Sequence, residues 1–176
     1  MENFVSILRG INLGNHNKIS MPELKALYEK LGFNKVQTYI QSGNVIFETE
    51  ETPTLAQTIE QGITSQFGFE IPVIIRRKSA LAQIIAGNPF LKDNSAFEDK
   101  MHVTLLANEP TPAVIEKIHD YPPDQYKIIG KEIYLYCPNG YGRTKLTNTF
   151  FEKKLKVIAT TRNWRTINEI FNRMNA

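Results

Sequence analysis

Two short polar stretches near the N-terminus carry the side chains best suited to chemistry. The first is "RGINLGNHNK", residues 9–18, and the second is "QSGN", residues 41–44, which separates two apolar runs. Both are rich in groups that donate hydrogen bonds, and neither contains Asp or Glu. Donors without carboxylates favour an anion or the polar edge of a nucleobase as ligand. The candidate ligand-binding residues are Arg9, Asn12, Lys18, Gln41, Ser42 and Asn44.

Residues 9–18 have two interpretations. In the first, backbone N–H groups together with Arg9 and Lys18 hold a phosphate. The stretch contains neither G-x-G-x-x-G nor G-x-x-x-x-G-K-S/T, so no established phosphate motif supports this. In the second, Asn side chains bond to their own backbone and tie down a long connection. For residues 41–44 we favour a simple hairpin turn, in which Gly43 supplies a positive φ.

A second group of basic candidates lies near the C-terminus. The stretch "NGYGRTKL", residues 139–146, places Arg143 and Lys145 shortly before an expected helix. A helix N-terminus flanked by two cations favours anions, whereas exposed charge on an ordinary loop is the alternative. No residue in these stretches is identified as catalytic, because no general base accompanies Ser42.

The stretch "ATTRNW" predicts the start of the last helix. Asn163 precedes the first helical residue, Trp164, and is a natural N-cap. Arg162 lies just outside the helix, where it either holds an anion with the helix N-terminus or pairs with an acidic surface group. Along the helix, Trp164, Ile167, Phe171 and Met174 share one face and are expected to dock it.

The charge of the chain is unevenly distributed. From Arg143 to Ala176 there are eight basic and two acidic residues, although the whole chain has a net charge of only +3. A basic end on a mildly acidic body suggests an anionic partner, either nucleic acid or a phosphorylated small molecule. The alternative is a solvated, lysine-rich helix face.

Composition argues against several other classes of protein. The single cysteine, Cys137, and three scattered histidines provide no disulfide and no metal-ligand spacing, so we expect neither a metal nor a cofactor. No apolar run approaches the roughly 20 residues of a membrane span, and the N-terminus does not resemble a secretion signal. We therefore expect a cytoplasmic protein without a membrane partner, for which a monomer is plausible.

The expected elements repeat along the chain. Residues 1–77 read β-α-β-β-α-β, with a capping box at Ser20 and Glu23 and a helix stop at Gly32. Residues 101–160 repeat this order, with helices over 111–118 and 147–155 and a short last strand at 157–160. The repeat predicts an α+β fold of two ferredoxin-like (split β-α-β) subdomains, an internal duplication, with additional C-terminal helices.

The predicted domains are an N-terminal subdomain at residues 1–86, a linker at 87–100 and a C-terminal subdomain with basic terminal helices at 101–176. In the split β-α-β unit, the connection after strand one and the hairpin between strands two and three share one sheet edge. Residues 9–18 and 41–44, which we call the N-terminal rim, should therefore be neighbours. We predict that Asn12 and Asn44 lie in one concave patch there.

The sequence also resembles a known family. "ILRGINLGNHNKISMPELKALYEKLGFNKVQTYIQSGNVIF", residues 7–47, and "ATTRNWRTINEI", residues 159–170, are similar to the bacterial domain-of-unknown-function family 1697 (DUF1697). The resemblance implies a cytoplasmic bacterial protein built from two ferredoxin-like subdomains. It implies no established activity. The chain departs from the family pattern at "GNHN", where a second glycine is usual, and at "GRTK", where Ser-Lys-Leu is common.

Three functions fit these residues. We favour a binding module for an anionic ligand, either nucleic acid or a phosphorylated metabolite. The first alternative is an enzyme acting on a phosphorylated small molecule, with Arg and Lys stabilising charge, although a general base is lacking. The second is a protein-interaction module that uses a sheet edge or the last helix. A rim loop filled by its own backbone bonds would favour that last function.

Overall fold

The two expected halves of the chain form separate units. The computed structural model describes the backbone of residues 1–176 and the side chains of residues 1–93 and 97–176. One unit comprises Met1–Leu81 and Ile170–Ala176, and the other comprises Ala82–Glu169. The segment 87–100, expected to be a linker, contains two short helices, α4 (Leu91–Asn94) and the 3-10 helix η1 (Ser95–Lys100). The predicted domain boundaries at 86 and 101 stay a prediction.

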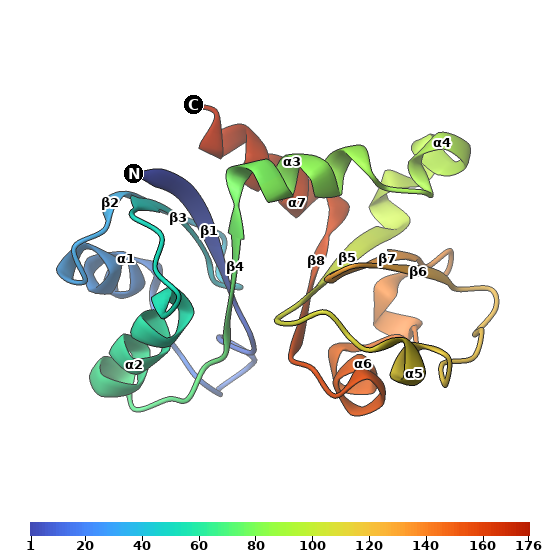
Figure 1. Ribbon diagram of the computed structural model, residues 1–176, viewed down its shortest axis with the longest axis horizontal. Helices are drawn as coiled ribbons and strands as arrows, with labels where there is room; N and C mark the ends of the chain where they lie inside the picture. The colour runs from blue at the N-terminus through green and yellow to red at the C-terminus, as the bar shows by residue number, and fades with distance from the viewer. The chain divides into compact units, whose positions relative to one another are not determined.

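The first unit contains one four-stranded sheet with the strand order β2-β3-β1-β4, and all neighbouring strands are antiparallel (Figure 1). Its elements are β1 (Glu2–Leu8), α1 (Met21–Lys30), β2 (Asn34–Tyr39), β3 (Asn44–Thr49), α2 (Leu55–Phe67) and β4 (Val73–Arg77), followed by α3 (Lys78–Ala86). The third strand lies between the first and second, as the split β-α-β unit requires.

A helix cap and the packing of the core position the loops of the first unit. Ser20 caps α1, since its Oγ accepts from the Glu23 N–H at 3.3 Å and donates to the Glu23 carboxylate at 2.6 Å. Helices α1 and α2 pack on the same face of the sheet (Figure 1). In that core the Tyr28 hydroxyl bonds to Ser6 Oγ at 2.6 Å, and Phe33 stacks on Phe47 with ring centroids 4.7 Å apart. This packing holds β1 and β3 beside each other. It therefore also brings together the connection that follows β1 and the turn that precedes β3.

The second unit repeats the architecture with the order β6-β7-β5-β8, which confirms the predicted duplication. The α5 helix is shorter than the expected 111–118. The last strand is later than the expected 157–160, because its polar residues pair with β5 in a register that runs from Ala159 to Asn163. The elements are β5 (Met101–Leu106), α5 (Pro112–Ile115), β6 (Gln125–Ile129), β7 (Glu132–Tyr136), the 3-10 helix η2 (Tyr141–Arg143), α6 (Asn148–Leu155), β8 (Ala159–Asn163) and α7 (Trp164–Met174).

The two units differ in which connection is long. In the first unit the β1–α1 connection spans residues 9–20, whereas its counterpart in the second spans 107–111. In the second unit the β7–α6 connection spans residues 137–147, whereas its counterpart in the first spans 50–54. β1 and β3 run antiparallel, as do β5 and β7. The long connection follows the first strand of one unit and the third strand of the other, so within its own sheet it begins at a different end of the strands. The longer of these two connections is therefore the β1–α1 connection in the first unit and the β7–α6 connection in the second.

The buried face of α7 differs in one residue from the expectation. Trp164, Ile167 and Met174 are buried as expected, but Ile170 completes the buried set and Phe171 is only half-buried. The helix lacks the length and apolarity of a membrane span, as do the other helices in the described part of the chain.

Asn163 provides a first testable prediction. Its Oδ1 accepts from the Thr166 N–H at 2.7 Å, which confirms the predicted N-cap of α7. The Asn163→Ala variant should lose about 1 kcal/mol of unfolding free energy, because one helix N–H is left without its acceptor. Urea denaturation measures this loss. The control is Asn172→Ala on the exposed side of the same helix, which should change stability by less than about 0.5 kcal/mol; equal losses in both variants would contradict the capping role.

Candidate functional site

The N-terminal rim is assembled as predicted. Asn12 Nδ2 donates to the Gln41 carbonyl at 2.8 Å, and the Leu8 N–H donates to the Gly43 carbonyl at 2.9 Å. These bonds join the end of β1 and the β1–α1 connection to the turn between β2 and β3. The topology argument from the sequence is therefore confirmed for this edge of the sheet.

The hydrogen-bonding groups of the Asn12 side chain are used within the rim. Besides the bond to Gln41, Nδ2 donates to the Ile19 carbonyl and Oδ1 accepts from the Ile19 N–H, both at 2.9 Å. Asn17 Nδ2 similarly donates to the Gly10 carbonyl at 3.1 Å. An amide side chain has two N–H donors and one carbonyl, so these contacts engage all three groups of Asn12. The second interpretation, in which Asn side chains tie down the loop, describes Asn12 and Asn17.

The turn at residues 41–44 is a hairpin turn stabilised by its own side chains. Asn44 is fully buried, and its Nδ2 donates to the Tyr39 carbonyl at 2.9 Å and to Ser42 Oγ at 3.2 Å. Gly43 has φ of +85°, which suits glycine. The expectation that Asn44 lines a concave patch with Asn12 is wrong, because Asn44 closes the turn from inside. Of the other rim candidates, Lys18 and Gln41 are exposed and Arg9 and Ser42 are half-buried.

Arg162 lies in β8 and is buried, with 8% of its surface exposed. Its Nη1 donates to Thr160 Oγ1 at 3.0 Å and to the Thr161 carbonyl at 2.9 Å. Burial lowers the pKa of Arg162 to about 10. The guanidinium therefore remains charged at neutral pH, within the protein rather than at an exposed helix end.

The first unit contains a counterpart of Arg162. Arg76 pairs with Val5 across β1 and β4, as Arg162 pairs with Val103 across β5 and β8. Arg76 is also buried, and its Nη1 donates to the preceding carbonyl, that of Ile75, at 3.0 Å. Because the same contact recurs at the same strand position in both units, we interpret it as part of the duplicated fold. The other candidate of this stretch, Asn163, uses its side chain to cap α7.

Arg143 and Lys145 lie together at a pocket in the second unit. The pocket has a volume of about 230 Å³. Both cations are exposed and, among the side chains described, neither forms an ion pair. We call this site the basic pocket; it is lined by Tyr121, Pro122, Pro123, Asp124, Asn139, Gly140, Arg143 and Lys145.

Thr144 positions the two cations. Its Oγ1 donates to Asp124 Oδ2 at 2.6 Å and accepts from the Leu146 N–H at 3.1 Å. Thr144 thereby ties the β7–α6 connection to the residues that precede β6. Since Arg143 and Lys145 flank Thr144, this cross-loop bond holds both of them at the basic pocket.

Cys137 and His102 are the groups near this loop that are of the type of a nucleophile or a base. Cys137 is fully buried, and burial raises the pKa of its thiol to about 11, although a hydrogen bond with Thr144 acts in the opposite sense. A thiol with this pKa is not a nucleophile at neutral pH. His102 stacks on Tyr141 at 4.6 Å, and burial lowers its pKa. Within the described residues, His, Cys, Asp and Glu side chains form no cluster of three or more that could hold a metal.

The sequence interpretation missed Asp124 and Asn139. A signal for them existed, because the connections before β6 and after β7 share a sheet edge in the split β-α-β unit. The N-terminal rim lies at the other end of the corresponding strands of the first unit, so that prediction did not include this loop. In the second unit the same topology places "YPPD", residues 121–124, beside "NGYGRTK", residues 139–145.

Comparisons with known proteins agree with the fold. A family profile described as "Protein of unknown function (DUF1697)" matches residues 1–134, which ends before the loop that carries Arg143 and Lys145. The structure of the conserved bacterial protein SP0830 from Streptococcus pneumoniae is similar, with a TM-score of 0.75, 20% sequence identity and coverage of 98% of each chain. At this identity the likeness shows the fold alone. A search of the curated proteins found no match.

Proposed function

This chain belongs to the DUF1697 family, and we propose that it is a binding module for a small anionic ligand. The ligand lies in the basic pocket of the second unit. The observation that carries the proposal is that Arg143 and Lys145, two cations without acidic partners among the described side chains, line the same pocket. The candidates of the N-terminal rim support it less, because Asn12 and Asn44 use their amides within the fold.

The charge and size of the basic pocket define the ligand class. Arg143 and Lys145 provide two positive charges against the single carboxylate of Asp124. Guanidinium and ammonium groups make charge-assisted hydrogen bonds to phosphate or carboxylate oxygens. The volume of about 230 Å³ lies below the roughly 300–1,000 Å³ of sites for drug-sized ligands. A phosphorylated metabolite suits this small volume better than nucleic acid, which requires an extended groove.

Protein interaction at the N-terminal rim is the second candidate function. The loop there is held by hydrogen bonds of its own, which favours that function. It presents Leu13, with 59% of its surface exposed, and the neighbouring turn presents Ile40, with 45% exposed. Enzyme function has less support, because the Cys137 thiol is buried with a raised pKa and His102 stacks on Tyr141.

Inorganic phosphate at low ionic strength tests the proposed function. The Arg143→Ala/Lys145→Ala double variant should bind phosphate at least about tenfold more weakly than the parent, because two charge-assisted contacts are lost. Isothermal titration calorimetry measures the difference. Raising the salt concentration should weaken binding to the parent, since the two cations are exposed.

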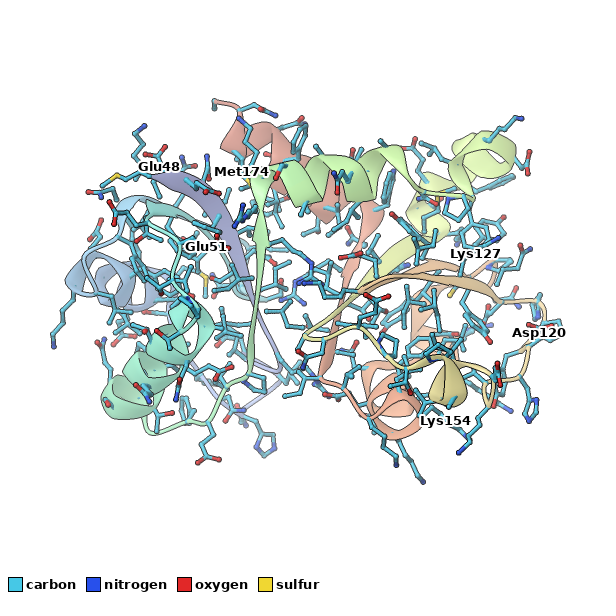
Figure 2. The ribbon with its side chains drawn as sticks, viewed as in Figure 1. Glu48, Glu51, Asp120, Lys127, Lys154 and Met174 are labelled. Carbon is cyan, nitrogen blue, oxygen red and sulfur yellow. The ribbon has the colours of Figure 1, made fainter. Side chains whose placement is uncertain are left out.

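The matched control removes the same charge elsewhere in the second unit. Lys153 and Lys154 are exposed on α6 and do not line the basic pocket; Figure 2 labels Lys154. The Lys153→Ala/Lys154→Ala variant should retain phosphate binding within about twofold. Equal weakening in both double variants would show that phosphate responds only to net charge, and the basic pocket would be rejected as the site.

A further inference from the structure

The basic pocket contains a carboxylate among its cations, and this deepens the proposed function, on which the inference rests. We infer that Asp124 makes the pocket select anions that also carry hydroxyl donors, as a sugar phosphate does. The anionic group lies at Arg143 and Lys145, and a hydroxyl of the same molecule donates to Asp124. An anion that has no donor is disfavoured.

The geometry of Asp124 supports a second set of ligand contacts. It is half-buried and is the one acidic residue among the described residues that line the pocket. Its Oδ2 accepts from Thr144 Oγ1 at 2.6 Å. A carboxylate offers about four acceptor sites and no donor, so one bond to Thr144 leaves capacity for more. Groups on the ligand that match these sites must be donors.

The same carboxylate acts against a simple anion. An oxyanion held by Arg143 and Lys145 shares a small pocket with the negative charge of Asp124, and like charges repel. Filling the pocket also removes water from the carboxylate, which costs free energy if no donor replaces that water. Sites built to hydrogen-bond a hydroxyl reject ligands that lack it for this reason.

Part of the pocket lining is apolar. Tyr121, Pro122 and Pro123 contribute it, and the Tyr121 ring lies edge-on against Phe150, with the ring centroids 5.3 Å apart. Such an apolar surface packs against the carbon skeleton of a ligand, while the few polar groups fix its orientation. The pocket therefore combines two cations, a carboxylate acceptor, the Asn139 amide and an apolar surface, which matches a phosphorylated sugar or polyol.

The Asp124→Asn variant tests the inference with two probes, ribose 5-phosphate and sulfate. Ribose 5-phosphate carries hydroxyl donors, and sulfate carries none. Asparagine keeps an acceptor for Thr144, so the cross-loop bond is retained, and thermal unfolding followed by circular dichroism checks this. We expect calorimetric titration to show ribose 5-phosphate binding about tenfold more weakly than in the parent, and sulfate binding roughly threefold more tightly.

The matched control is Asp120→Asn, which makes the same change at an exposed site in the same unit that does not line the pocket; Figure 2 labels Asp120. It should leave both affinities unchanged within about twofold. If Asp124→Asn weakens both probes equally, Asp124 acts through the loop, and if it strengthens both, it acts only as a charge. Either result overturns the inference.

The outcome for the proposed function is separate. Suppose that binding disappears in Arg143→Ala/Lys145→Ala, but that Asp124→Asn does not weaken ribose 5-phosphate binding while strengthening sulfate binding. This result overturns only the inference. Binding of both probes that survives in Arg143→Ala/Lys145→Ala overturns the proposed function. Absence of binding of both probes to the parent chain overturns both.

Discussion

The Trp164→Ala variant should lose about 3–5 kcal/mol of unfolding free energy. Trp164 begins α7 and has only 3% of its surface exposed, so the truncation removes a large buried ring and leaves a cavity. Because Trp164 is the one tryptophan of the chain, its fluorescence is lost in the variant. Urea denaturation followed by far-UV circular dichroism therefore measures the loss. A decrease below about 1 kcal/mol would contradict the burial of this ring.

Arg162→Ala provides the comparison variant for Trp164→Ala. If Arg162 is part of the duplicated fold, its removal lowers stability by a comparable amount, because Thr160 and the Thr161 carbonyl lose a buried charged donor. The folded fraction of the Arg162→Ala variant should still bind phosphate at the basic pocket. An Arg162→Ala variant with an unchanged melting temperature and no phosphate binding would instead place Arg162 in a ligand site. The exposed neighbour Arg165 supplies a control, since Arg165→Ala should change stability by less than about 0.5 kcal/mol.

The Gly43→Ala variant should lose about 2–5 kcal/mol of unfolding free energy. Two effects add, because Gly43 has φ of +85° and a Cβ there would lie 2.7 Å from Ile11 Cδ1 and 3.0 Å from Leu8 Cβ. A left-handed backbone costs an L-residue about 1–2 kcal/mol, and overpacking costs about 1–3 kcal/mol. The Ile11 methyl can move aside, but Leu8 Cβ is fixed by β1. Urea denaturation of the variant gives the total.

Gly32→Ala separates the two effects. Gly32 has φ of +88°, similar to that of Gly43, but a Cβ there meets no atom within 4 Å. Its loss should be only the backbone term, about 1–2 kcal/mol. The difference between the two variants measures how closely the turn approaches the β1–α1 connection. Equal losses would mean that the N-terminal rim tolerates an added methyl group, contrary to its observed packing.

The sequence predicted those parts of the fold that depend on local chemistry. The Ser20 cap of α1, the Asn163 cap of α7 and the turn at Gly43 each follow from a few neighbouring residues, and each is present. The repeated order of elements predicted the duplication and, through it, the meeting of residues 9–18 with 41–44. The last strand was placed too early, because its residues 159–163 are mostly polar and only pairing with β5 makes them a strand.

The sequence by itself determined which side chains can donate hydrogen bonds or carry charge, whereas the tertiary structure decided where those groups are used. Asn12 and Asn44 donate to the backbone of their own rim, and Arg162 is buried in β8. Arg143 and Lys145 differ because their loop is tied by Thr144 to Asp124 and leaves both cations at a pocket. The physical reason is that a polar group binds a ligand only when backbone or neighbouring side chains do not already satisfy it. That depends on distances between segments far apart in the chain, which composition and periodicity do not contain.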